Sequence, residues 1–178
     1  GRLRFDFSHD QAMTKEEIAE VEDIVNNEIE AAIDVETHIM TLDEAKKTGA
    51  MALFGEKYGD SVRVVSIGNF SRELCGGTHV KNTSDIGTFK IVSEAGVAAG
   101  TRRIEALTSK GAIDYYKKAE SDLIAAAKAA KTDMSGVAAR IDQLLQEIKT
   151  LNAENKKLKD KMAKDSVGDV MSNVVEHN

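Results

Sequence analysis

Apolar residues recur along this chain with two different periods, and these periods separate strands from helices. Residues 2–8 alternate apolar and polar side chains, which is typical of a half-buried strand. After Thr14 the apolar residues are three or four positions apart, which predicts a helix with one apolar face. Thr14 and Glu17 have the spacing of a capping box at the start of that helix. Its expected apolar face consists of Ile18, Val21, Val25, Ile29 and Ala32.

The region from residue 33 to residue 110 reads as further strands with one short helix. A second capping box, Thr41 with Glu44, predicts a short helix that Gly49 ends. The expected strands after the first cover 35–40, 62–67, 70–74, 86–94 and 102–108, with a loop of small residues over 95–100. Two helices and about six strands predict an α+β domain with an antiparallel or mixed sheet.

From residue 111 the composition shifts to alanine, lysine and glutamate, which favours helices. One helix is expected over 112–131, a turn over 132–136, and a second helix after it. In the second helix, spacings of four and three alternate through Val137, Ile141, Leu144, Ile148, Leu151, Asn155, Leu158 and Met162. This repeat is a heptad seam.

The heptad seam leaves two arrangements open. One is an antiparallel helical hairpin, and the other is a homo-oligomer formed through the exposed seam. Asn155 occupies an a position, where a buried amide fixes register or partner number. The predicted organisation is therefore a domain over 1–110, a helical hairpin or coiled-coil connector over 111–165 and a loose tail over 166–178.

Composition narrows the classes of function. With 42% apolar and 30% charged residues among 178, the chain has the make-up of a soluble globular protein without a membrane partner. The whole net charge of −6 falls within 1–110, which argues against broad nonspecific binding of nucleic acid. One cysteine excludes an internal disulfide and suits the cytoplasm. The start lacks an initiator methionine, so we expect a fragment of a larger protein.

The segment with the clearest chemistry is Cys75-Gly76-Gly77-Thr78-His79. A thiolate and an imidazole four positions apart form a typical half-set of zinc ligands, although this spacing alone is a weak signal. Glycines between them allow positive φ and close approach of a bound group. The alternative is a tight turn with a buried thiol and a hydrogen-bonded histidine.

Four phrases together resemble the alanyl-tRNA synthetase family. They are Leu3-Arg4-Phe5-Asp6-Phe7-Ser8-His9, the run 51–59, the run 70–79 that contains the Cys75 segment, and the run 98–106. The resemblance covers residues 2 to about 110 densely. It implies the later part of an editing domain, followed by the helical connector toward a C-terminal domain. Related modules occur in threonyl-tRNA synthetases and in free-standing alanyl-tRNA editing hydrolases.

The resemblance implies a zinc-dependent hydrolysis of mischarged seryl- or glycyl-tRNA(Ala). The family binds zinc with an early His-x3-His pair and a late Cys-x3-His pair, and Cys75 and His79 match the late pair. The early pair is missing, because the other histidines are His9, His38 and His177. We therefore expect this chain to be weakly metallated or metal-free and inactive alone. The parent ligase would use ATP to attach alanine to tRNA, with ATP bound in a region outside this chain.

The resemblance also suggests roles for individual side chains. Cys75 is expected to be a zinc ligand, with a nucleophilic Cys75 activated by His79 as the alternative. Gly76 and Gly77 would let the turn approach the substrate, and Thr78 would bind a substrate hydroxyl or cap the turn.

Arg102 and Arg103 are the candidates for binding a phosphate of the tRNA acceptor end. As neighbours on a strand they point to opposite faces, so at most one would do so, and a surface ion pair is the other reading. The competing function from another class is a noncatalytic helical interaction arm on an α+β domain.

Overall fold

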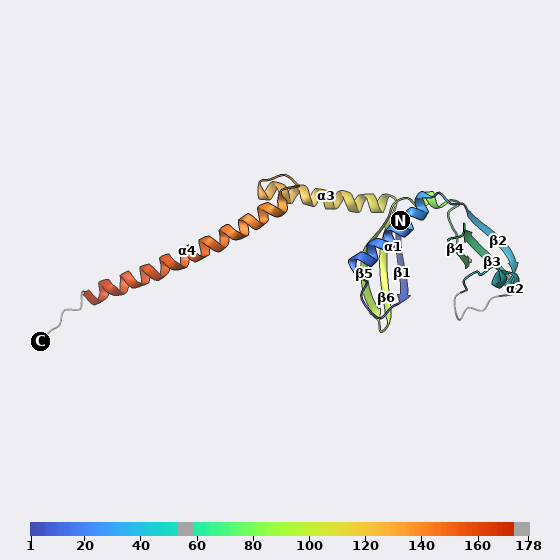
Figure 1. The fold of residues 1–178 in the computed structure, drawn as a ribbon, viewed down its shortest axis with the longest axis horizontal. Coiled ribbons are helices and arrows are strands. Elements are labelled where there is room, and N and C mark those ends of the chain that lie inside the picture. Colours follow the sequence, from blue (N-terminus) through green and yellow to red (C-terminus); the bar gives the residue numbers. More distant parts are fainter. Residues whose placement is uncertain (53–58, 173–178) are drawn as a thin grey trace. The chain divides into compact units, whose positions relative to one another are not determined.

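The computed structural model describes residues 1–52 and 59–172, with side chains described up to 164. It divides into two compact units, Gly1–Tyr116 and Lys117–Asn178. The first unit holds two three-stranded antiparallel sheets, with strand orders β1-β6-β5 and β2-β3-β4 (Figure 1). The α+β fold class expected from the sequence is confirmed, although its strands form two sheets and not one.

The elements follow one another along the chain with short connections. In order they are β1 (Arg2–Ser8), α1 (Lys15–Glu30), β2 (Val35–Thr41), α2 (Leu42–Lys47), β3 (Ser61–Ile67), β4 (Ser71–Leu74), the 3-10 turn η1 (Thr83–Ile86), β5 (Phe89–Ala98), β6 (Thr101–Thr108), α3 (Lys110–Ala130) and α4 (Val137–Ser172).

Helix α1 covers one face of the β1-β6-β5 sheet and closes the larger core. The buried members are Ile29, Phe89, Ile91, Ile104 and Ala106, with Phe7, Met13, Ile18, Val21, Val25 and Ile86 packed around them. The capping box is confirmed, since the Glu17 amide donates to Thr14 Oγ1 at 3.1 Å and the Thr14 amide donates to Glu17 Oε2 at 2.7 Å. The side chain of Asn26 accepts from the Phe89 amide at 2.9 Å and so ties the helix to β5.

The β2-β3-β4 sheet packs against the short helix α2 and closes a smaller core. Its buried members are Ala45, Val62, Val64 and Leu74, with Met40, Leu42 and Ala50 around them. The second capping box, Thr41 with Glu44, is also confirmed. Gly49 follows the helix with φ 75°, a left-handed conformation that glycine adopts without strain.

The strand expected over 86–94 is present but shifted to Phe89–Ala98, and the reasons are local. Asn82 Oδ1 accepts from the Ser84 amide at 3.0 Å and starts η1, so β5 begins only at Phe89. The expected loop over 95–100 is mostly strand, because β5 continues to Ala98 with irregular pairing. A Cβ at position 96 would lie 3.2 Å from Arg102 Nη1, so glycine there lets the arginine cross the strand.

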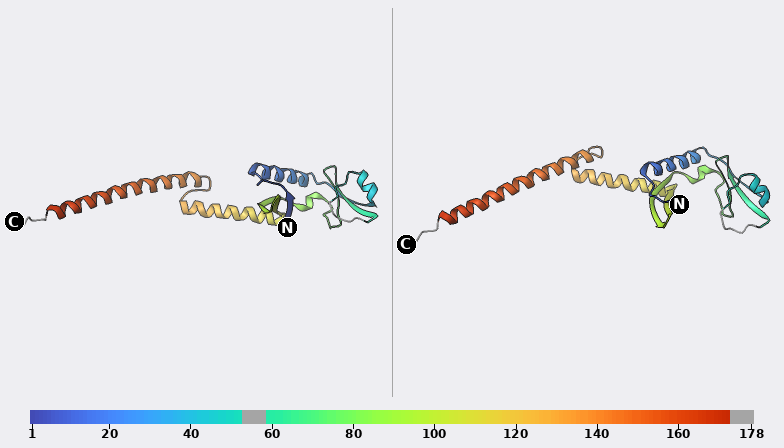
Figure 2. Two further views of the ribbon diagram at one scale, coloured as in Figure 1. Left: turned by 90° about the horizontal axis from the view of Figure 1, so that it is seen from below. Right: turned by 60° about the horizontal axis from the view of Figure 1, so that its bottom comes forward.

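The C-terminal part is helical as expected, with a turn between α3 and α4 (Figure 2). The Thr132 amide donates to the Ala127 carbonyl at 3.0 Å, and Asp133 Oδ1 accepts from the Gly136 amide at 2.8 Å just before α4 begins. Helix α4 extends to Ser172, so the expected loose tail is wrong over 166–172, while 173–178 lie outside the described residues.

Most of the heptad seam of α4 after Val137 is solvent-exposed, and Leu144 is half-buried. Val137 is buried beside the turn, whereas Ile148 is 53%, Leu151 62%, Leu158 62% and Met162 69% exposed. Within the described ranges, the structure has no helix long and apolar enough to cross a membrane. The resemblance phrase over 51–59 lies mostly outside the described residues.

Candidate functional site

The end of strand β4 brings the two candidate metal ligands together. Leu74 is buried in the smaller core, and the Cys75 amide then donates to the Arg63 carbonyl on the neighbouring strand at 3.1 Å. The chain turns through two glycines, and His79 Nε2 lies 3.2 Å from Cys75 Sγ. Cys75 is half-buried and His79 is exposed, so a sulfur and a ring nitrogen meet at the protein surface.

The Arg63 side chain fixes the backbone of this turn. Its Nη1 donates to the Cys75 carbonyl at 2.7 Å and to the Gly77 carbonyl at 2.6 Å, and its Nη2 reaches Thr37 Oγ1 at 3.4 Å. Sequence reasoning missed this residue. The available signal was a single arginine between the valines at positions 62, 64 and 65 of the expected strand.

The two glycines act differently from the expectation. Neither Gly76 nor Gly77 has a positive φ, so left-handed backbone is not the reason for glycine here. A Cβ at Gly76 would meet open space, whereas a Cβ at Gly77 would lie 3.6 Å from Cys75 Sγ and 4.0 Å from His79 Nε2. The missing side chain at Gly77 therefore keeps one side of the donor pair open. Thr78 beside it is exposed.

The geometry of the pair fits two ligands of one zinc ion. Tetrahedral zinc with ordinary Zn–S and Zn–N bonds separates its sulfur and nitrogen by about 3.6 Å, close to the 3.2 Å seen here. A complete site needs a third or fourth donor. No cluster of three or more His, Cys, Asp or Glu side chains able to hold a metal occurs in the part of the chain that the structure describes.

The other histidines are not part of this pair. His9 lies 3.9 Å from Asp10, and His38 lies 3.4 Å from Glu36. His177 lies outside the described residues. Among the histidines that the structure describes, His79 is therefore the one that contacts Cys75.

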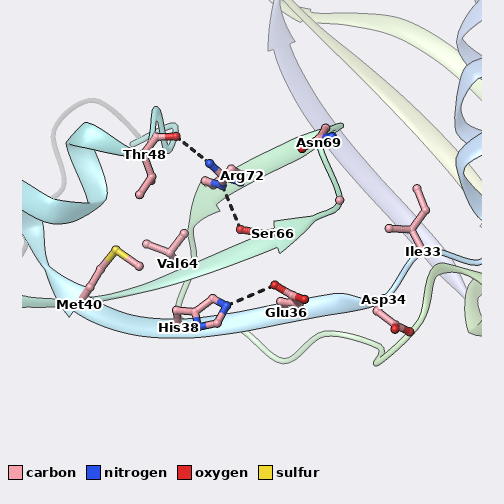
Figure 3. Close-up of a pocket in the computed structure, with 11 residues that line it drawn as sticks. Ile33, Asp34, Glu36, His38, Met40, Thr48, Val64, Ser66, Asn69 and Arg72 are labelled. Carbon is pink, nitrogen blue, oxygen red and sulfur yellow. Dashed lines mark hydrogen bonds and ion pairs between the residues drawn. The ribbon is translucent and has the colours of Figure 1, made fainter.

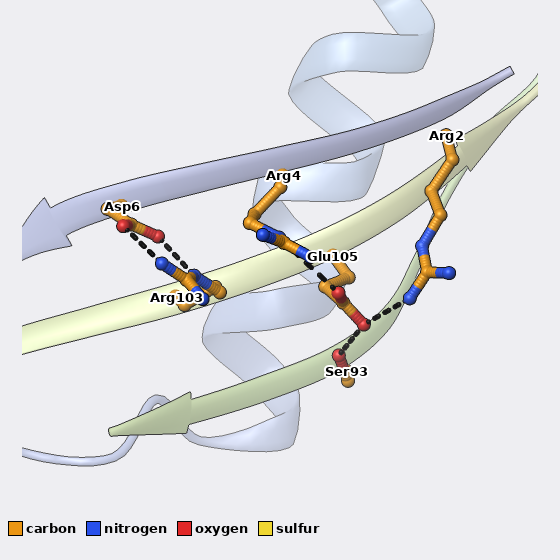
Figure 4. A network of polar contacts seen from close by, with 6 residues as sticks. All are labelled: Arg2, Arg4, Asp6, Ser93, Arg103 and Glu105. Carbon is orange, nitrogen blue, oxygen red and sulfur yellow. Dashed lines mark hydrogen bonds and ion pairs between the residues drawn. The ribbon is translucent and has the colours of Figure 1, made fainter. Parts of the chain in front are cut away.

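Both candidate phosphate-binding arginines are in ion pairs in the other sheet. Arg102 makes a two-pronged pair with Glu94, with Nη2 at 2.8 Å from Oε2. Arg103 makes one with Asp6 at 2.6 and 2.7 Å (Figure 4). Hydrogen bonds from the guanidiniums lower the pKa of Glu94 and of Asp6 below their ordinary values.

These arginines lie on opposite faces of the β1-β6-β5 sheet, as strand alternation predicts. Glu94 pairs with Ile104 in the strand register, so Glu94 and its partner Arg102 lie on the face that α1 covers. Asp6 pairs directly with Arg103, so these two residues lie on the other face. On the second face Glu105 Oε2 accepts from Arg2 Nη2 at 2.9 Å, and its pKa is lowered by that bond (Figure 4). The structure does not bring these arginines to the Cys75 turn, which follows the other sheet.

A cavity of about 550 Å³, lined by both polar and apolar side chains, lies on the α2 side of the second sheet (Figure 3). Its walls include Glu36, His38 and Arg72, and Arg72 is held by Ser66 Oγ at 3.2 Å and the Thr48 carbonyl at 2.9 Å. Arg63 alternates to the opposite face from these strand positions. The cavity is therefore separate from the Cys75–His79 pair, and sequence reasoning did not find it.

Comparison with known proteins relates the chain to one group of enzymes. Residues 62–105 match the family described as threonyl and alanyl tRNA synthetase second additional domain. The chain is 61% identical over 98% of its length to alanine–tRNA ligase 1 of Lachnoclostridium phytofermentans. It is 51% and 52% identical over 99% of its length to the alanine–tRNA ligases of Pseudoalteromonas translucida and Acetivibrio thermocellus.

In each case the chain spans only 20% of the length of the relative. The resemblance seen in the sequence phrases is thereby confirmed over nearly the whole chain, including the helices after the sheets. This chain corresponds to one segment of alanine–tRNA ligase, the segment that contains the second additional domain.

Proposed function

We propose that this segment carries the hydrolytic proofreading of alanine–tRNA ligase, with seryl- and glycyl-tRNA(Ala) as substrates. The contact between His79 Nε2 and Cys75 Sγ at 3.2 Å is the observation that supports it. It brings a thiol and an imidazole side by side on a turn whose Cys75 and Gly77 carbonyls accept hydrogen bonds from Arg63 of a neighbouring strand.

The need for such a site follows from the size of alanine. A pocket that accepts a methyl side chain rejects glycine or serine by only about 10- to 200-fold. A second site that hydrolyses the wrong aminoacyl ester removes the remaining errors. The tRNA(Ala) acceptor end must therefore present its aminoacyl group beside the Cys75 turn.

We assign Cys75 and His79 as zinc ligands and Gly77 as the residue that keeps their open side accessible. When bound, zinc would orient the substrate or activate water. The remaining donors would come from a His-x3-His pair outside this chain, so the segment alone is expected to be weakly metallated and inactive. Gly76 and Thr78, exposed on the same turn, would contact the aminoacyl group.

A phosphate contact from Arg102 or Arg103 stays a prediction. Each guanidinium already satisfies a carboxylate through two hydrogen bonds, so a phosphate would have to compete with Glu94 or Asp6. Attachment of alanine with ATP, in the cytoplasm, is proposed for the whole ligase and not for this segment.

The test uses a full-length alanine–tRNA ligase that carries this segment. Cys75→Ala and His79→Ala should each slow deacylation of seryl-tRNA(Ala) by more than the roughly 10- to 100-fold typical of an outer-shell change, and lower the bound zinc. Alanylation of tRNA(Ala) should be unchanged. A Cys75→Ala enzyme that clears seryl-tRNA(Ala) at the normal rate would contradict the proposal.

The two glycines provide a matched pair for the same assay. Gly77→Ala places a methyl against both donors and should slow deacylation, while Gly76→Ala faces open space and should not. If Cys75 were instead a nucleophile activated by His79, Cys75→Ala would abolish hydrolysis while the bound zinc stayed unchanged.

A second role is proposed for the helical part, namely self-association. The exposed apolar seam of α4 supports it, because contiguous exposed apolar surface of this kind marks an interaction site. Sedimentation of the 178-residue chain at increasing concentration should show a homo-oligomer, and Leu151→Glu with Leu158→Glu should abolish it.

A further inference from the structure

The seven arginines of the chain differ in whether a carboxylate pairs with them. Five form ion pairs with a glutamate or an aspartate, namely Arg2, Arg4, Arg102, Arg103 and Arg140. Among the residues that the structure describes, no carboxylate pairs with Arg63 or with Arg72. Both belong to the second sheet, and each therefore has a positive charge that no side chain described here neutralises.

The guanidinium of Arg63 lies beside the candidate zinc ligands. Its Nη1 donates to the Cys75 carbonyl at 2.7 Å, and the same cysteine carries the sulfur that contacts His79. The Cys75 amide donates to the Arg63 carbonyl at 3.1 Å, so the two residues are neighbours across the sheet and their side chains share a face. The half-buried charge of Arg63 is thus next to the place where the aminoacyl ester is expected.

The Cys75 turn uses only some of the hydrogens of this guanidinium, which has five. Nη1 donates to the two carbonyls of the turn, and Nη2 has one long contact, to Thr37 Oγ1 at 3.4 Å. Within the described part of the chain, no residue accepts from Nε of Arg63. Nε and Nη2 form the edge with which Arg103 binds Asp6. On Arg63 the same edge is open to a two-pronged anion.

The proposed substrate has an anion at the matching place. In seryl- or glycyl-tRNA(Ala) the amino acid is esterified to the ribose of the last nucleotide, so its own carboxylate charge is lost. The nearest negative charge is then the phosphodiester that precedes this nucleotide. An ester held at the Cys75 turn therefore brings a phosphate within one nucleotide of Arg63. Unlike Arg102 and Arg103, this guanidinium can bind it without giving up a carboxylate.

We propose that Arg63 binds the last phosphodiester of the tRNA acceptor end through its Nε–Nη2 edge, while Nη1 holds the Cys75 turn. The inference rests on the proofreading function proposed above and adds a substrate contact to it. One side chain then anchors both the phosphate and the backbone that carries the zinc ligands. The ester is positioned relative to Cys75 and His79 by this shared anchor.

A neutral linkage tests the contact in a full-length alanine–tRNA ligase that carries this segment. Seryl-tRNA(Ala) is made with a methylphosphonate in place of the last phosphodiester, and kcat/KM for deacylation is measured for both substrates. In the wild type the neutral linkage should lower kcat/KM about tenfold or more, as expected for the loss of a charge-assisted contact. In Arg63→Met the two substrates should react equally well, because the phosphate has lost its partner. Arg63→Gln, which keeps an amide donor for the turn but no charge, should give the same result.

Arg72→Met is the matched control, because Arg72 also lacks a carboxylate partner among the described residues but lies on the opposite face of the sheet. It should keep the wild-type preference for the charged linkage. A wild type that hydrolyses both substrates equally would overturn the inference, and so would an unchanged preference in Arg63→Met or Arg63→Gln. Normal clearance of seryl-tRNA(Ala) by Cys75→Ala would instead overturn the proposed function itself.

Discussion

The two sheets of the first unit differ in whether their reactive side chains are paired with side chains of opposite charge. The β1-β6-β5 sheet has the larger core, and its charged residues are matched in place, with Glu94 beside Arg102 and Asp6 beside Arg103. The β2-β3-β4 sheet has a smaller core of short side chains and ends in Cys75. There the thiol and the imidazole of His79 contact each other and face solvent.

The difference predicts that the stability of the domain and the proposed site depend on different sheets. In the first sheet, acidic side chains form ion pairs with basic side chains, which leaves little unpaired charge for a ligand. In the second, the Arg63 guanidinium binds backbone carbonyls, so the donors themselves remain available. We therefore expect damage to the first sheet to affect folding, and damage to the second to affect the site.

The largest expected effect is on the free energy of unfolding, and it differs between the two cores. Phe89→Ala should lower the free energy of unfolding by about 3–5 kcal/mol, because it leaves a cavity under α1 where the larger core lies. Leu74→Ala in the smaller core should cost less, near the low end of about 2–5 kcal/mol. Chemical denaturation measures both.

The control for these core changes is Phe70→Ala. Phe70 is largely exposed, so its removal should have little effect on stability. If Leu74→Ala proved as damaging as Phe89→Ala, the smaller core would carry equal weight and the comparison between the sheets would fail.

The next effect concerns the hold of Arg63 on the Cys75 turn. Arg63→Met removes hydrogen bonds to the Cys75 and Gly77 carbonyls, each charge-assisted and worth about 1.5–3 kcal/mol. Exchange of the Cys75 amide should become roughly 10- to 100-fold faster, since its bond to the Arg63 carbonyl then opens more often. Hydrogen exchange followed by NMR measures it.

Arg72→Met is the matched variant on the same sheet. It removes bonds to Ser66 and to the Thr48 carbonyl but none to the turn, so the Cys75 amide should keep its protection. Equal acceleration in both variants would mean that Arg63 acts only through the stability of the whole sheet.

Sequence reasoning recovered the elements that depend on local signals. Both capping boxes, at Thr14 and Thr41, begin helices where expected, and alternation in residues 2–8 gives a strand. It failed where the extent of a strand depends on pairing with a strand that is distant in the sequence. β5 runs through Gly96 because β6 supplies its partners, and strand periodicity alone cannot show that the strands form two sheets.

The sequence predicted the two donors of the candidate site but not the arginine that holds their turn in place. Cys75 and His79 are four residues apart, so their contact depends on a local turn. Arg63 comes from another strand, and its bonds are to backbone carbonyls that carry no sequence signal. The partners of Arg102 and Arg103 likewise required the register of three strands, although alternation correctly placed the two on opposite faces.

Acid should weaken the ion pairs of the first sheet. Arg102 lowers the pKa of Glu94 in the folded protein below its ordinary 4.5. A lowered folded pKa contributes stability above the unfolded value, and that contribution is lost as pH falls below about 4.5 and through the folded pKa. Glu94→Gln should therefore reduce stability at pH 7 and approach wild type in acid, as thermal unfolding from pH 7 to 3 would show.

The matched group beside the second sheet is Glu44 on helix α2, whose pKa is lowered by hydrogen bonds from Thr41. Glutamine also serves at this position of a capping box, so Glu44→Gln should flatten the acid response less than Glu94→Gln. A larger effect at Glu44 would place the acid-sensitive contacts in the second sheet.

The smallest expected effect concerns His38 and Glu36 beside the cavity of the second sheet. Their contact at 3.4 Å is solvent-exposed, and neither side chain is tied to the core. His38→Gln should therefore change the free energy of unfolding by no more than about 0.5 kcal/mol. The seryl-tRNA(Ala) deacylation rate of the full-length ligase should also stay unchanged, because this position alternates to the face opposite Arg63 and the Cys75 turn. A loss of deacylation rate at unchanged stability would show that the cavity face takes part in the reaction. It would contradict the assignment of the reaction to the face that carries Arg63 and the Cys75 turn.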